Sequence, residues 1–180
     1  MALTEPHDKS IIAAAMGLNG YNLKERIMIH STPQLIKVDA FTVMGLSERT
    51  KNSNEFNSET ARLPGLWQRF YASKISIKPS SPIYGVYSAY EADHNGFYTV
   101  TAGIATHDLE ITDDFSRVSI KEGDYLIFKN SGPIPKAIIE IWQAIWHYFD
   151  TQSTVSRAYE TDFEVYMGQE QCAVYIGIKK

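Results

Sequence analysis

Glu164 lies in residues 158–166, whose alternating side chains predict a β-strand with two distinct faces. One face would carry Tyr159, Thr161, Phe163 and Val165, and the other Glu160, Asp162, Glu164 and Tyr166. Taken alone, this pattern favours an acidic face that meets water. If the acidic face instead lined an apolar groove, desolvation would raise the pKa of Glu164 and leave its carboxylate in need of a cationic partner. The chemistry open to this residue is therefore the non-covalent binding of a cation.

Aromatic side chains are the second chemical resource of the chain, because eleven Tyr, eight Phe and three Trp make up 12% of it. Core packing explains many of them, but the excess of Tyr indicates a ligand surface, since tyrosine joins a rigid apolar face to a polar tip. The candidates for groove walls are Trp67, Phe70, Tyr71, Tyr84, Tyr87, Trp142, Trp146, Phe149 and Tyr166. For the helical ones, core packing is the simpler explanation. Tyr84 and Tyr87 fall on opposite faces of one predicted strand, so at most one faces a groove.

Motifs for catalysis, metal binding or cofactor binding do not occur in the sequence. It contains neither a phosphate-binding glycine loop nor a nucleophile-elbow serine, and its five histidines lack the spacing of metal ligands. Cys172 begins the last predicted strand and is interpreted as a small packed residue, not a nucleophile. We therefore expect a binding protein that is not an enzyme and that uses no metal or cofactor.

The length, net charge and cysteine count of the chain limit the kinds of partner and the cellular location that we expect. A chain of 180 residues fits one domain with a sizeable core. The net charge is −4 and the basic residues are scattered, which argues against direct contact with nucleic acid. No apolar run reaches the length of a membrane span. A single cysteine excludes an internal disulfide framework, and together with the lack of a secretory pattern it favours the cytoplasm.

The first half of the chain predicts a strand, a helix and a hairpin. Residues 1–35 show no clear period beyond a short helix at 11–16, and their role is unknown. Regular patterns then predict a strand at 36–46, a polar loop at 47–58, a helix from Pro64 to Tyr71, and strands at 83–90 and 97–105 around an Asn95-Gly96 turn.

The second half predicts the same order. Residues 114–120 and a turn at 122–123 lead to a strand at 125–129, a helix from the break at 132–135 to Phe149, and strands at 158–166 and 173–179 around Gly168. The helix is apolar over most of its circumference. Either the first helix, a ligand or the N-terminal 35 residues must therefore cover it.

Three matches in register indicate that the two halves are repeats. Leu66-Trp67-Gln68 matches Ile141-Trp142-Gln143, and Tyr84 and Tyr159 each follow the respective Trp by 17 residues. Gly103 follows Trp67 by 36 residues, and Gly177 follows Trp142 by 35. We therefore predict an α+β fold: duplicated units with pseudo-twofold symmetry, whose two helices flank a central groove on an antiparallel sheet. Clefts between packed units are common ligand sites.

The second half also resembles a known family. The similar segments are Asp124–Phe128, Gly132–Pro135, Ile141-Trp142, Asp162–Tyr166 and Val174–Lys179. In this order they look like the GyrI-like effector-binding domain, the ligand-binding domain of AraC- and MerR-type transcription regulators. This domain also occurs alone, including in integron cassettes. The resemblance covers residues 36–180. At one position the chain departs from the family: the family's last strand contains a proline, whereas this chain has Gly177. We expect this departure to affect the edge of the strand.

The resemblance implies a duplicated fold with a groove for drug-like cations or peptides. Glu164 would meet the positive charge of the ligand while aromatic rings sandwich its body, and this implication reverses the preference for a solvated acidic face. We expect a stand-alone binding protein, a monomer or weak dimer, for cationic aromatic or amphipathic compounds, acting in drug sensing or sequestration. The alternatives are a groove for a peptide or protein partner and, as in some relatives, a hydrolase of strained small molecules.

Overall fold

The computed structural model describes residues 32–55, 57–77, 81–106, 115–151, 154–168 and 170–179. The strands are β1 (Gln34–Val38), β2 (Phe41–Thr50), β3 (Ile83–Ser88), β4 (Tyr98–Ala105), β5 (Ser116–Ile120), β6 (Gly123–Ser131), β7 (Ser156–Tyr166) and β8 (Gln171–Lys179). The helices are α2 (Asn52–Glu55), α3 (Leu63–Ala72) and α4 (Lys136–Thr151), with a 3₁₀ turn η1 (Lys74–Ile77). No helix within these ranges is long and apolar enough to cross a membrane. The predicted helix at 11–16 lies outside the described residues.

The strand order confirms the predicted duplication. In the described ranges, eight antiparallel strands form one sheet in the order β1-β6-β8-β7-β3-β4-β2-β5. Exchanging β1 with β5, β2 with β6, β3 with β7 and β4 with β8 reverses this order, as expected for a pseudo-twofold axis between β3 and β7. Tyr87 and Asp162 pair across that junction. β1 pairs with β6 and β5 with β2, so each half lends its first strand to the other.

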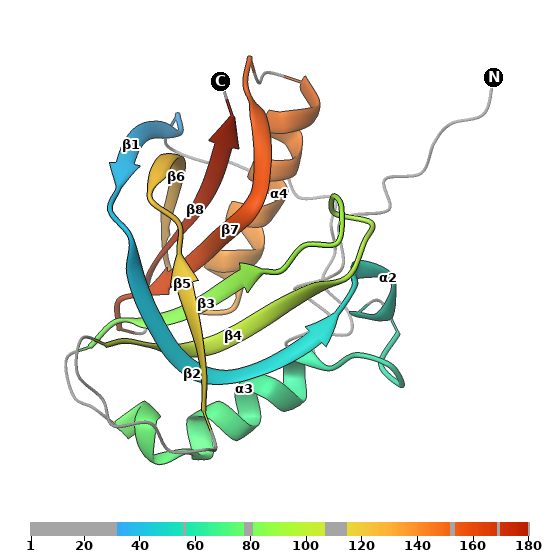
Figure 1. The fold of residues 1–180 in the computed structure, drawn as a ribbon, viewed down its shortest axis with the longest axis vertical. Helices are drawn as coiled ribbons and strands as arrows, with labels where there is room; N and C mark the ends of the chain where they lie inside the picture. The colour runs from blue at the N-terminus through green and yellow to red at the C-terminus, as the bar shows by residue number, and fades with distance from the viewer. Residues whose placement is uncertain are drawn as a thin grey trace.

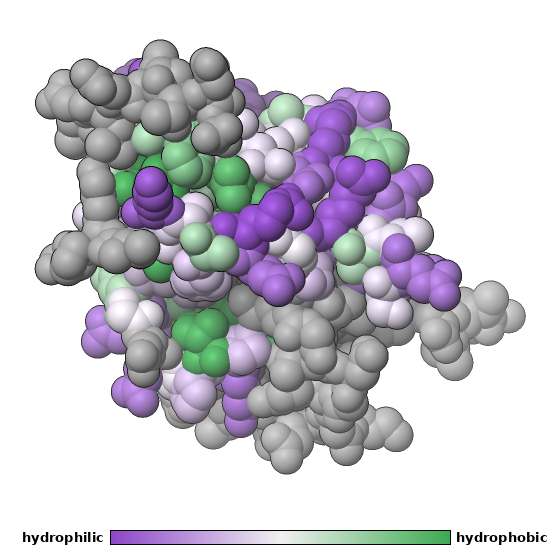
Figure 2. All heavy atoms as spheres, turned by 90° about the horizontal axis from the view of Figure 1, so that it is seen from below, coloured by the Kyte–Doolittle hydropathy of each residue, from purple (hydrophilic) through white to green (hydrophobic). Residues whose placement is uncertain are grey.

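The helices α3 and α4 pack on one face of the sheet (Figure 1). α3 contacts β2 and β4, whereas α4 contacts β6 and β8, again as the repeat requires. Buried side chains from both helices, including Leu66, Phe70, Ile138 and Ile141, belong to one hydrophobic core with residues of the sheet. Figure 2 views the molecule from the side of α3, where hydrophilic residues form a broad band across the surface. The outer face of α3, with Gln68 and Arg69, therefore meets solvent.

A smaller core fills the opposite face of the sheet. It contains Val43, Val86, Ile120, Tyr125, Phe163 and Val165. Side chains of the terminal strands β1 and β5, among them Ile36, Val38 and Val118, pack against this core. β5 also contacts β3, which is not its neighbour in the sheet. The sheet therefore bends until its own edge strands cover this face (Figure 1).

The predicted strand at 36–46 and loop at 47–58 were both wrong in detail. The chain forms two strands, β1 and β2, and β2 continues to Thr50 before the short helix α2. The buried carboxylate of Glu55 explains this, because it accepts hydrogen bonds from the Thr50 hydroxyl and from the backbone N–H groups of Arg62 and Leu63. Such free N–H groups at a helix start need an acceptor. The polar segment is thus folded back to begin α3.

The predicted face of Tyr159 was also wrong. The register of β7 against β8 shifts between Arg157 and Asp162, and Tyr159 has a positive φ of 52°. A bulge of this kind breaks the alternation of faces. The Tyr159 ring packs at 5.5 Å from Tyr90, whose hydroxyl donates to Asp162, so Tyr159 leaves the face of Phe163 and Val165.

Gly177 lies in the interior of the sheet and not at its edge, because β8 runs between β6 and β7. Its backbone N–H donates to Oδ1 of Asp162 at 2.8 Å. A proline at this position would lose this hydrogen bond, because proline has no N–H to donate.

Candidate functional site

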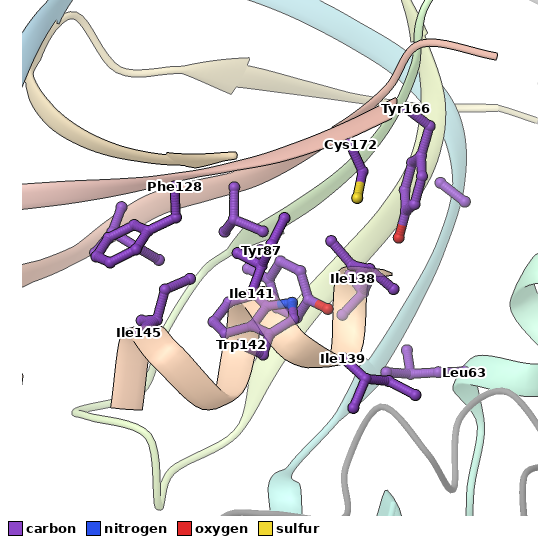
Figure 3. Close-up of a cluster of buried hydrophobic side chains, with 14 of the residues drawn as sticks. Leu63, Tyr87, Phe128, Ile138, Ile139, Ile141, Trp142, Ile145, Tyr166 and Cys172 are labelled. Carbon is purple, nitrogen blue, oxygen red and sulfur yellow. The ribbon is translucent and has the colours of Figure 1, made fainter. Parts of the chain in front are cut away.

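Glu164 lies on the helix-covered face of β7, and only 2% of its surface is exposed. Its Oε1 accepts hydrogen bonds from the Tyr87 hydroxyl at 2.9 Å and from Nε1 of Trp142 at 2.7 Å. Its Oε2 accepts from the Tyr166 hydroxyl at 2.7 Å. In Figure 3, Tyr87 and Trp142 meet between the sheet and α4. Sheet and helix together thus surround one acid with aromatic hydrogen-bond donors.

Gly85 makes room for this arrangement. It pairs with Glu164 across β3 and β7 and lies on the same face. A Cβ atom on Gly85 would lie 2.6 Å from Oε2 of Glu164, closer than such atoms pack, and at a tight 3.1 Å from Cζ2 of Trp67. Sequence reasoning missed Gly85, although a glycine within a strand is a known signal of close approach.

Burial and hydrogen bonding act in opposite directions on Glu164. Desolvation raises its pKa above the ordinary value, while the hydrogen bonds from Trp142, Tyr166 and Tyr87 lower it, and the net shift is upward. Burial and the charge of Glu164 raise the pKa values of Tyr87 and Tyr166 well above that of free tyrosine. Both hydroxyls therefore stay protonated and donate. Among the described residues, no ion pair includes Glu164.

Helix α3 places Trp67 and Tyr71 on the same side of Glu164 as Tyr166. The Trp67 ring meets the Tyr166 ring edge-on at 5.6 Å and stacks on Tyr71 at 5.9 Å. Tyr71 is 58% exposed, and its pKa is raised by partial burial and by the charge of Glu164. Phe70, by contrast, is fully buried in the core. Trp67 and Tyr71 therefore extend the aromatic surface from Glu164 towards solvent.

A pocket opens on the other side of Tyr87 and Trp142. It is open to solvent and is lined by Asn52, Tyr87, Tyr90, His94, Tyr98, Trp142, Trp146 and Arg157. Trp146 lies next to Trp142 with ring centroids 6.2 Å apart. Tyr87 and Trp142 line the pocket and also donate to Glu164, so these two side chains lie between the pocket and the acid.

The predicted site residues divide into two sets. Glu164, Tyr87, Trp142 and Tyr166 are in direct contact, and Trp67, Tyr71 and Trp146 lie around them. Three do not join the site: Phe70 belongs to the core, Phe149 packs on Tyr148, and Tyr84 lies on the opposite face with Phe41 and Phe163. Tyr84 and Tyr87 lie on opposite faces of the sheet, as expected, and of the two only Tyr87 lines the pocket.

Sequence reasoning missed much of the pocket wall. The tilted rings of Tyr90 and Tyr98 lie 5.8 Å apart across the β3–β4 hairpin, a pairing that the Asn95-Gly96 turn could have suggested. No sequence pattern marked Arg157 as a pocket residue, because its position depends on the bulge in β7. Its Nη2 donates to Oδ2 of the fully buried Asp162 at 2.6 Å. Burial alone would lower the pKa of Arg157, but the charges of Asp162, Tyr90 and Tyr159 and the hydrogen bond to Asp162 together outweigh burial and raise it.

Groups suited to covalent or metal chemistry are not prominent in the described part of the chain. Cys172 is 1% exposed, and burial and nearby carboxylates raise the pKa of its thiol to about 12, so it stays a packed thiol. No group of three or more His, Cys, Asp or Glu side chains within the described ranges could hold a metal ion. The arrangement is suited to holding a ligand between rings, next to a desolvated acid.

Comparisons with known proteins agree with this architecture. The family model for integron-associated effector binding protein, Cass2, matches residues 34–178. The Bacillus subtilis protein YobU, described as a transcriptional regulator, is 30% identical over 149 residues, which cover 76% of this chain and 91% of YobU.

Solved structures show the same fold. The Vibrio cholerae integron cassette protein VCH_CASS2 matches with a TM-score of 0.75 and 30% identity, over 82% of this chain and 95% of that one. SAV2435, solved bound to tetraphenylphosphonium, matches with a TM-score of 0.66 and 18% identity, over 83% and 94% of the two chains. The resemblance noted in the sequence is thereby confirmed. The chain belongs to the integron-associated effector-binding protein family.

Proposed function

We propose that this protein binds organic cations with aromatic or amphipathic bodies, and that Glu164 supplies the negative charge that holds them. The buried carboxylate of Glu164 carries the proposal, because it has hydrogen-bond donors around it but no cationic side chain paired with it among the described residues. A buried charge without a counter-ion is costly. A cationic guest would remove that cost.

The aromatic surround supports the same class of ligand. Trp67, Tyr71, Trp142 and Trp146 offer ring faces and edges on both sides of the acid. A cation over a ring gains about 0.5–2 kcal/mol. Two or three such contacts, added to the attraction of a desolvated carboxylate, are enough for micromolar affinity, on the order of −8 kcal/mol.

A related protein offers a specific probe. SAV2435, which shares the fold, is bound to tetraphenylphosphonium, a permanent cation that carries four phenyl rings. That compound combines the two properties that the Glu164 site would recognise. Sensing or sequestration of such compounds is the role that we propose. A groove for a protein partner and hydrolysis of strained small molecules stay hypotheses, since no contact within the described ranges favours either.

Tetraphenylphosphonium binding to a Glu164→Gln variant tests the proposal. Tryptophan fluorescence reports binding directly, because the Trp142 indole donates to Glu164. We expect saturable quenching of the native protein and an affinity loss of about tenfold or more in the variant, equal to about 1.4 kcal/mol. Glutamine keeps the shape and removes the charge.

Glu160→Gln is the matched control, because Glu160 lies on the same strand but is exposed. This variant should bind like the native protein. Equal affinity in all three proteins would show that the buried charge does not hold the ligand. Thermal melts without ligand identify any loss that comes from misfolding.

A further inference from the structure

Arg157 places a charged group in the wall of the pocket that Tyr87 and Trp142 also line. Its guanidinium carbon lies 4.7 Å from the centroid of the Tyr159 ring and 6.0 Å from that of Trp142. The side chain is 9% exposed and pairs with Asp162, which is fully buried. The pocket thus already holds one cation over an indole, and that cation has its own counter-ion.

The pairing of Arg157 is incomplete. Nη2 donates to Asp162, but Nε is buried and has no hydrogen-bond partner among the described residues. Asp162 is already occupied, because Oδ2 also accepts from the Tyr90 hydroxyl and Oδ1 accepts from the Gly177 N–H. A buried donor without an acceptor lowers stability. An acceptor brought by a ligand would complete the hydrogen bonding of this guanidinium.

Trp142 links this group to the acid of the proposed site. Its Nε1 donates to Glu164, while its ring faces Arg157. Asp162 and Glu164 are two residues apart on one face of β7, which corresponds to about 7 Å along a strand. Trp142 therefore contacts both an acid that has no ion-pair partner among the described residues and a guanidinium whose Nε donor is unused.

We propose that Arg157 determines specificity by donating a hydrogen bond to an acceptor oxygen carried by the bound cation. This inference rests on the proposed function and narrows the ligand class. Preferred ligands are organic cations that also carry a carbonyl, ether or carboxylate oxygen, with the cationic group at Glu164 and the oxygen at Arg157. Compounds with a second positive charge at that end are disfavoured, because it would face the guanidinium.

Two dyes with one cationic core test this inference. Tetramethylrhodamine methyl ester and tetramethylrosamine share the same xanthylium cation, and only the former carries an ester on its pendant phenyl ring. Fluorescence anisotropy gives the two dissociation constants. For the native protein we expect the ester to bind about tenfold more tightly, as a hydrogen bond to a charged donor allows.

Substitution of Arg157 should remove that preference. Arg157→Lys keeps a positive charge near Asp162 but lacks the Nε donor, so the ratio of the two dissociation constants should fall towards one. A double variant, Arg157→Met with Asp162→Asn, removes both charges together and should give the same result if the single variant folds poorly. Arg69→Lys, a control whose side chain is 52% exposed and paired with Glu48, should keep the native ratio.

The outcomes separate this inference from the proposed function. If the native protein binds both dyes equally, or if the Arg157 variants keep the native ratio of dissociation constants, Arg157 does not donate a hydrogen bond to an oxygen of the ligand. Rosamine binding that weakens in Glu164→Gln would then leave the proposed function standing. If neither dye binds saturably, the proposed function fails and this inference fails with it.

Discussion

Two opposing effects act on the pKa of Glu164, and burial is the larger. Its burial favours the neutral acid, whereas donors from Tyr87, Trp142 and Tyr166 favour the carboxylate. Each donor comes from a different element, since Tyr87 lies on β3, Trp142 on α4 and Tyr166 on β7. The charge of one residue thus depends on the correct packing of a strand pair and a helix. The affinity of a ligand that needs this charge would therefore depend on all three hydrogen bonds.

Binding of tetraphenylphosphonium should therefore depend on pH. This cation does not titrate, so its affinity should fall as the pH drops through the pKa of Glu164, which is raised above its ordinary value of 4.5. Tyr166→Phe removes one donor to the carboxylate and should move the midpoint upward by about one pH unit, the equivalent of a hydrogen bond to a charged group. Fluorescence titrations at a series of pH values measure the midpoint.

Tyr175→Phe is the control for this shift, because Tyr175 stacks on Phe163 on the opposite face of the sheet. Its midpoint should match that of the native protein. A pH-independent affinity, or an unmoved midpoint in Tyr166→Phe, would separate ligand binding from the ionisation of Glu164.

Among the elements, β3 and β7 form the floor of the site. β7 presents Asp162 and Glu164 on one face, and β3 presents Tyr87 with a gap at Gly85. The bulge in β7 adds the third feature: Arg157 lines the pocket, and its guanidinium lies over the Tyr159 ring. The helices α3 and α4 each add a tryptophan beside Glu164: Trp67 on α3 and Trp142 on α4, which occupy matching positions in the two repeats.

Filling the gap in β3 should weaken binding. In Gly85→Ala, the added Cβ would push against Oε2 of Glu164, so the acid must turn away from Tyr166. We expect affinity for tetraphenylphosphonium to fall about tenfold, with a smaller loss of stability, measured by titration and thermal melts.

Gly65→Ala is the matched control on α3. The nearest atom to its added Cβ is the flexible end of Arg69 at 3.4 Å. Replacing a helical glycine by alanine stabilises by about 0.5–1 kcal/mol. This variant should therefore melt at a higher temperature and bind with native affinity. Identical binding by the two alanine variants would contradict the role given to Gly85.

At the scale of the whole molecule, the exchange of first strands joins the two halves. β1 extends the sheet of the second half, and β5 extends that of the first. The larger core likewise contains side chains from α3 and α4 together. Neither half can complete its sheet or its core alone, so the site at their junction forms only when both are folded.

This architecture predicts one cooperative unfolding transition. Leu66 is fully buried in the first half, and Leu66→Ala should lower the free energy of unfolding by about 2–5 kcal/mol. Because the halves are interlocked, circular dichroism and tryptophan fluorescence should shift to the same new urea midpoint. Separate midpoints for the two signals would mean that the halves unfold independently.

Local patterns in the sequence determined most of the elements and the repeat. The helix at 63–72, the hairpin around Asn95-Gly96 and the last two strands follow from periodicity and turn chemistry, which act between near neighbours. The paired spacing of Trp, Tyr and Gly predicted the pseudo-twofold sheet, and the family resemblance singled out Glu164. Short-range rules suffice for such features, because each half repeats the same local chemistry.

Tertiary structure alone decided how the site is built. Whether Glu164 meets water or aromatic rings depends on residues as distant as Tyr87, which lies 77 positions away in the sequence. The strand exchange, the bulge at Tyr159 and the pairing of Arg157 with Asp162 likewise arise only when strands from both halves align. The burial of a charge is a property of everything packed around it, and no local pattern of residues contains that information.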